Sequence, residues 1–247
     1  MGIAINYNKI KINKMKKYLI VSAVVLSSAI ICSHANAQNP AAEAEQKSRD
    51  SSVQVRAHEM VKSLNLNDPA KEQRVETVIY THLIAVRDWN NRHQSSMVPD
   101  GIDPSTGKPL SDMDKQIIIL SSIPKSVHQN LMDGLKKDLT DEQVVAILDK
   151  YTVGKVAFTM QGYHAIVPDL TPEEATTIEG YLKQAREQSV DFKNMKQISA
   201  IFEIYKTKSE QYLNSHGRDW HKLYGDYTKK IIAEKKAKAD AEAAKPK

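Results

Sequence analysis

The only two tryptophans of this 247-residue chain lie in the same tripeptide, Arg-Asp-Trp. The first copy, Arg87-Asp88-Trp89, is followed closely by Asn90 and His93, and the second copy is Arg218-Asp219-Trp220. A flat indole can stack on the C–H face of a sugar, while guanidinium and amide groups bind hydroxyls or a uronate carboxylate. These residues therefore suggest an oligosaccharide site. The candidate binding residues are Arg87, Trp89, Asn90, His93, Tyr163 and Arg186.

Each tryptophan also has a purely structural interpretation, in which the ring fills the core at a helix end and its polar neighbours cap that end. The first copy is favoured as a site by its position. It lies just before residues 97–109, which hold Pro and Gly at five positions and cannot continue a helix. A long irregular segment of this kind could form the rim of a binding site.

A catalytic interpretation of the same region uses His93 or His128 as the acid/base group, because imidazole titrates near neutral pH. Arg87 or Arg186 would then hold an anionic substrate. Asp88 is a further catalytic candidate, since glycoside hydrolysis needs two carboxyl groups that are close only in space. The loop-proximal carboxylates that could form such a pair are Asp88, Asp100, Asp103 and Asp169. Individually, each is more often a helix cap or a solvated charge, so the sequence does not decide whether the chain is an enzyme.

Other chemistries lack their motifs. The histidines are scattered and no His-Glu-x-x-His is present, so we expect no metal site. Walker, Gly-x-Gly-x-x-Gly and Gly-x-Ser-x-Gly segments are also missing from the sequence, and we expect no cofactor.

The net charge of +5 belongs to the first 37 residues. This segment has five lysines and no acidic residue, followed by an apolar run over 18–32 and the small-x-small sequence Ala35-Asn36-Ala37. These features predict a signal peptide over 1–37, with Met15 as a plausible true start and a periplasmic or secreted mature protein. Cys32, the only cysteine, follows Ile31 where a lipoprotein needs a small residue, so lipidation is not expected.

After cleavage the chain carries as many basic as acidic residues, which argues against a nucleic-acid partner. It also holds no segment long and apolar enough for a transmembrane helix. The oligomeric state is not readable from the sequence.

The mature chain reads as helices. We expect a flexible leader over 38–50, a helical domain over 51–232 and a charged tail over 233–247. Capping residues predict helix starts, and apolar residues recur every three to four positions behind them. Residues 153–160 fit either a helix or a strand, and we favour the helix. The predicted starts are Asn67 or Asp68, then Ser111, Thr140, Thr171, Asn194 and Asp219. The fold class is therefore all-α, in a single domain.

Two short segments share the form Leu-Thr-x-x-Gln/Glu, at 139–143 and 170–174. They resemble the LTxxQ signature of periplasmic helical chaperones. A helix N-cap preceded by an apolar residue explains both equally well.

A broader resemblance rests on seven segments in order along the chain: 85–90, 123–128, 139–144, 151–156, 166–171, 182–187 and 201–206. Together they look like an uncharacterised family of exported bacterial proteins, classed as a domain of unknown function, over roughly residues 60–230. The resemblance implies an exported, largely helical protein whose relatives tend to be encoded near polysaccharide-degradation genes. It supplies no catalytic residues.

Three functions follow as expectations. The leading one is an exported accessory protein of glycan utilisation that binds an oligosaccharide, which could contain uronate. The second is a glycan hydrolase or lyase. The third is an LTxxQ-like periplasmic chaperone or scaffold, which would present an exposed apolar face.

Overall fold

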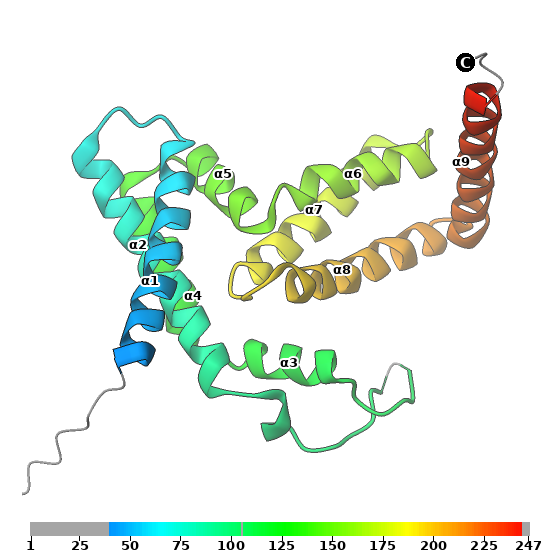
Figure 1. The fold of residues 1–247 in the computed structure, drawn as a ribbon. Helices are drawn as coiled ribbons and strands as arrows, with labels where there is room; N and C mark the ends of the chain where they lie inside the picture. The colour runs from blue at the N-terminus through cyan, green and yellow to red at the C-terminus, as the bar shows by residue number, and fades with distance from the viewer. Residues whose placement is uncertain (1–39, 105, 244–247) are drawn as a thin grey trace, which may run out of the picture. The chain divides into compact units, whose positions relative to one another are not determined.

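The computed structural model describes residues 40–104 and 106–243, and within these ranges its regular structure is helical (Figure 1). A single isolated antiparallel bridge joins Ile102 to Pro109 in this part of the chain. The all-α prediction is confirmed. The helices are α1 (Pro40–Lys62), α2 (Pro69–Arg92), the 3-10 turn η1 (Ser95–Met97), α3 (Asp112–Ser121), α4 (Lys125–Asp138), α5 (Asp141–Thr152), α6 (Lys155–Ile166), α7 (Pro172–Ser189), α8 (Met195–Ser215) and α9 (Trp220–Ala243).

The predicted helix starts are observed. Ser111, Thr140 and Thr171 each form a reciprocal capping box with the residue three positions later. The two Leu-Thr-x-x-Gln/Glu segments therefore act as N-caps of α5 and α7. Residues 155–160 belong to α6, as favoured, and the left-handed pair Val153 and Gly154 separates α5 from α6.

A first hydrophobic core joins α1, α2, α4 and α5. Its centre consists of fully buried aliphatic side chains and one tyrosine. These include Val61, Val75, Ile79, Leu131, Leu135, Ile147 and Tyr151. Gly134 of α4 lets this core close tightly, because a Cβ built there would lie 2.7 Å from a methyl carbon of Val78 on α2.

A second hydrophobic core forms where α6, α7 and α8 pack together, with one residue from α3. Helices α7 and α8 run side by side as a hairpin (Figure 1). The buried members include Leu120, Tyr163, Ile178, Leu182, Ile201, Phe202 and Leu213, while Trp89 and Trp220 pack at its margin.

The leader prediction differs from the structure, because α1 already begins at Pro40. Its Ala, Glu, Gln and Lys composition favours helix formation. Side chains one turn apart support it, with Arg49 donating to Glu45 and Gln46 to Asp50. Asp50 also forms an ion pair with Arg87 of α2. Residues 50 and beyond are thus part of the packed domain.

The predicted charged tail continues α9 within the described residues, and its side chains are exposed through Glu242. The predicted signal peptide, with Met15, Cys32 and the cleavage position after Ala37, lies outside the described residues. Among the helices of the described part, none is long and apolar enough to cross a membrane.

Candidate functional site

The first Arg-Asp-Trp segment lies in the last turns of α2, where Trp89 is held by two contacts. Its indole N–H donates to the carbonyl of Ile119 at 3.1 Å, which ties α2 to α3. The ring stacks on the imidazole of His93, with 3.8 Å between the centroids. These contacts give Trp89 the structural role that was the alternative to a sugar site.

The polar neighbours of Trp89 are also engaged within the protein. Arg87 is largely buried and pairs with Asp50 of α1 and with Asp88. His93 uses its Nδ1–H to donate to the carbonyl of Trp89 at 2.9 Å. Asn90 is half-buried on the same helix. The region around Trp89 is a junction of α1, α2 and α3.

The structure separates the remaining candidates. Arg186 is buried on α7, where it pairs with Asp149 of α5 at 2.8 Å. Asp100 pairs with Lys115, and Asp169 with Arg218. The six candidate binding residues do not form one site. No group of three His, Cys, Asp or Glu side chains in the described ranges is arranged to hold a metal ion.

The second Arg-Asp-Trp segment spans the connection from α8 to α9. Arg218 donates to both carboxylate oxygens of Glu174 at 2.9 Å, and also to Asp169 at 2.7 Å. The guanidinium holds the pKa of Glu174 at about 2, well below its usual value. Asp219 accepts from the backbone N–H of Lys222 at 3.0 Å, as an N-cap does. Arg218 and Asp219 thus fix the start of α9 against the first turn of α7.

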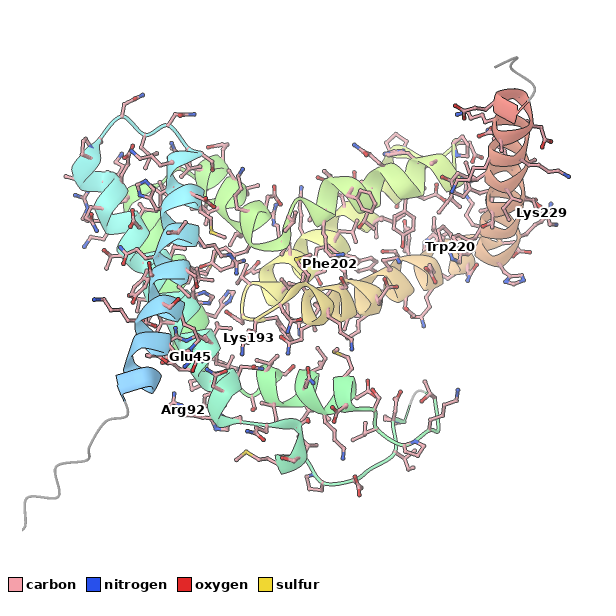
Figure 2. All side chains as sticks on the ribbon, viewed as in Figure 1. Glu45, Arg92, Lys193, Phe202, Trp220 and Lys229 are labelled. Atoms are coloured by element: carbon pink, nitrogen blue, oxygen red, sulfur yellow. The ribbon has the colours of Figure 1, made fainter. Side chains whose placement is uncertain are left out.

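Trp220 then lies in the first turn of α9 and faces a hollow between α6, α8 and α9. Figure 2 shows Trp220 and Phe202 on the ribbon of this part of the chain. The hollow has a volume of about 610 Å³, and we call it the aromatic groove. Its aromatic lining residues are Phe158, Tyr163, Phe202, Trp220, Tyr224 and Tyr227.

Three rings of the aromatic groove lie in series. Tyr163 and Trp220 have centroids 5.3 Å apart, and Trp220 and Tyr224 are stacked at 6.0 Å. Two of the rings are open to solvent, since Phe158 is 76% exposed and Tyr224 is 52% exposed. The groove therefore presents flat apolar faces that the fold does not cover.

Polar groups lie between these rings. Lys206 pairs with Glu203 at 3.0 Å, and the ammonium of Lys155 lies 5.5 Å from the centroid of Phe202. Burial raises the pKa of Glu210 above its usual value, while Lys206 partly offsets this effect. Burial also raises the pKa of Tyr163, whose hydroxyl donates to the carbonyl of Lys206. Alternating rings and hydrogen-bonding groups can hold a polyhydroxylated chain by stacking and by hydrogen bonds.

Of the candidate binding residues, only Tyr163 lines the aromatic groove. Sequence reasoning did not include Phe158, Tyr224 or Tyr227 among the candidate site residues. The spacing of the two tyrosines with Trp220 puts all three on one face of α9, and that spacing was the available signal. Periodicity shows which side chains share a face, but it does not show whether a neighbouring helix covers that face.

The fold and this site define an all-α domain with an open aromatic groove at one side of its second core. The chain belongs to the family described as "Protein of unknown function (DUF3826)", whose model matches residues 50–233. The match covers both cores, the aromatic groove and most of α9. Comparison with curated proteins finds no match.

Proposed function

We propose that this protein is an exported accessory protein of glycan utilisation that binds an oligosaccharide in the aromatic groove. The observation that carries the proposal is the set of six aromatic side chains that line a hollow of about 610 Å³, two of them more than half exposed. Small-molecule sites commonly have volumes of roughly 300–1,000 Å³ and combine aromatic walls with a few polar groups. The exposure of an aromatic ring to water is unfavourable, so a sugar ring that stacks on it and covers its face stabilises the complex.

The proposal places the sugar rings on Trp220 and Tyr224, with hydroxyls directed to Glu210, Lys206 and the carboxylate of Glu203. Because the two α8 carboxylates accompany only two lysines in the lining, the groove has no strong preference for an anionic chain. Neutral and sparsely charged oligosaccharides are therefore the expected ligands of this site.

Isothermal titration calorimetry against a panel of plant and algal oligosaccharides tests the proposal. We expect saturable heats with at least one member, and a loss of affinity of about fivefold in Trp220→Ala, because a stacked aromatic ring contributes about 1 kcal/mol. Ile232→Ala is the matched control, since Ile232 is an exposed residue of the same helix that does not line the groove. Uniform absence of heat, or equal losses in both variants, would remove the proposal.

A further inference from the structure

A separate cavity of about 320 Å³ lies where the start of α4 meets the end of α7. Leu120, Ile123 and Phe192 supply its apolar lining. None of these residues lines the aromatic groove, so this cavity is distinct from the groove. Its polar lining contains a histidine and a lysine from α4 and a largely buried carboxylate, Asp191, from the α7–α8 connection.

The histidine, His128, is held in one orientation by Asp191. One oxygen of Asp191 accepts from Nδ1–H of His128 at 2.9 Å, and the other accepts from Nε2–H of His82 at 2.9 Å. Nδ1 of His82 in turn lies 3.1 Å from the hydroxyl of Tyr151. Because Asp191 is fixed from α2 and α4 at once, its carboxylate determines both the ring orientation and the proton position of His128.

The second nitrogen of His128 has a much looser partner. Nε2 lies 3.6 Å from a carboxylate oxygen of Glu187, which is longer than a hydrogen bond. The side chain of Glu187 is 58% exposed, so little holds it at this position. A carboxylate thus already approaches Nε2 without bonding to it, and a better-placed carboxylate could replace it.

A second cation lies on the same face of α4. Lys125 precedes His128 by three positions, a spacing that brings side chains together on a helix, and both line the cavity. Gln129 and Gln188 line it from α4 and α7 and offer amide groups for hydroxyls. The cavity therefore combines a carboxylate position, hydroxyl partners and an apolar floor within the size of a small-molecule site.

We propose that this cavity, the His128 pocket, is a second ligand site that binds a single sugar acid, with the ligand carboxylate between Nε2 of His128 and the ammonium of Lys125. The hydroxyls of the sugar meet Gln129 and Gln188, and its apolar face lies on Phe192. This site is independent of the aromatic groove, and either site can exist without the other.

Binding of a carboxylate by His128 depends on pH, because only the imidazolium form donates from both nitrogens. The hydrogen bond to Asp191 raises the pKa of His128 above its usual value, and burial works against this effect. Affinity is therefore highest at mildly acidic pH and falls as pH rises through that pKa. The charged and titratable groups that face His128 are Asp191 on the α7–α8 connection, Glu187 on α7, Lys125 on α4, and His82 on α2 acting through Asp191.

Calorimetry of the full chain with D-galacturonate and D-galactose tests the pocket, because these sugars differ only in the carboxylate. At about pH 5.5 we expect the acid to bind about tenfold or more tightly than the neutral sugar, and to weaken severalfold by about pH 8.5 as His128 loses its proton. Equal affinity for the two sugars, the absence of galacturonate binding at the lower pH, or binding that does not change with pH would overturn the proposal.

Variants separate the pocket from structural effects and from the aromatic groove. His128→Gln and Lys125→Met should each weaken galacturonate binding by about tenfold, the loss of one charged contact. Lys125 is exposed, so its replacement reports on binding even where His128→Gln lowers stability. Glu187→Gln should tighten binding by removing the competing carboxylate, and Trp220→Ala should leave it unchanged. Weaker binding in Glu187→Gln would contradict the assigned carboxylate position.

Discussion

Arg87-Asp88-Trp89 and Arg218-Asp219-Trp220 consist of the same three side chains, yet they lie at opposite ends of their helices. Near the end of α2, Asp88 cannot cap a helix start and instead pairs with Arg87. At the start of α9, Asp219 caps the new helix, and Arg218 pairs with Glu174 of α7. The surroundings of the two tryptophans differ in the same way.

In the first copy the indole bonds to a carbonyl of α3 and stacks on His93. In the second copy the ring borders the aromatic groove, beside the exposed ring of Tyr224. The position of this motif relative to a helix end, more than its residue types, therefore determines whether its aromatic ring packs against another helix or lines an open groove.

The largest expected effect is on the free energy of unfolding, and it distinguishes the two tryptophans. Trp89→Ala removes a packed ring and a partly buried hydrogen bond, and we expect it to lower the free energy of unfolding by about 3 kcal/mol. Trp220→Ala removes a ring at the margin of the second core and should cost about half as much. Urea unfolding followed by circular dichroism measures both. Equal costs would break the comparison.

A second pair of variants compares packing around the two regions. Gly134→Ala places a Cβ against Val78 in the first core and should destabilise the protein by about 1–3 kcal/mol through overpacking. Gly162→Ala, in the α6 wall of the aromatic groove, meets nothing within 4 Å and should be neutral or stabilise by up to about 1 kcal/mol through helix propensity. Thermal unfolding of both variants checks the contrast, which a stable Gly134→Ala protein would contradict.

The smallest expected effect concerns the anchor of α9. Arg218 lowers the pKa of Glu174 to about 2, against an ordinary value of 4.5. A lowered pKa means stability that is present above pH 4.5 and is lost as pH falls toward 2. The difference in unfolding free energy between the wild-type chain and Glu174→Gln should therefore be largest near neutral pH and shrink on acidification through that range. Urea titrations at several pH values measure it, and a difference that stays constant would rule out the ionic anchor.

Most of the fold could be predicted because its signals are local. A capping residue predicts a helix start together with a partner only three positions away, and this prediction is confirmed at Ser111, Thr140 and Thr171. The helix from Pro40 was missed because a composition rich in Ala, Glu, Gln and Lys is typical both of helices and of flexible segments, and because Arg87, the partner of Asp50, is distant in sequence.

The candidate site was harder to predict for a related reason. Trp89 and Trp220 follow the same Arg-Asp pair, and it is the tertiary contact of Trp89 with Ile119 that distinguishes its packed ring from one that borders a groove. The pairing of His128 with Asp191 likewise joins residues that are far apart in the chain. Among the candidate binding residues, Tyr163 alone lines the aromatic groove, and the helical periodicity of α6 places it there.

The separation of the two tryptophans also gives the protein a built-in optical reporter. Since the chain has only two indoles, a Trp89→Phe variant would emit solely from Trp220, and a Trp220→Phe variant solely from Trp89. Fluorescence of the first variant would then follow occupancy of the groove directly, while the second would register events at the junction of α2 with α3. A titration with any oligosaccharide could thus be assigned to one region of the molecule without an added label.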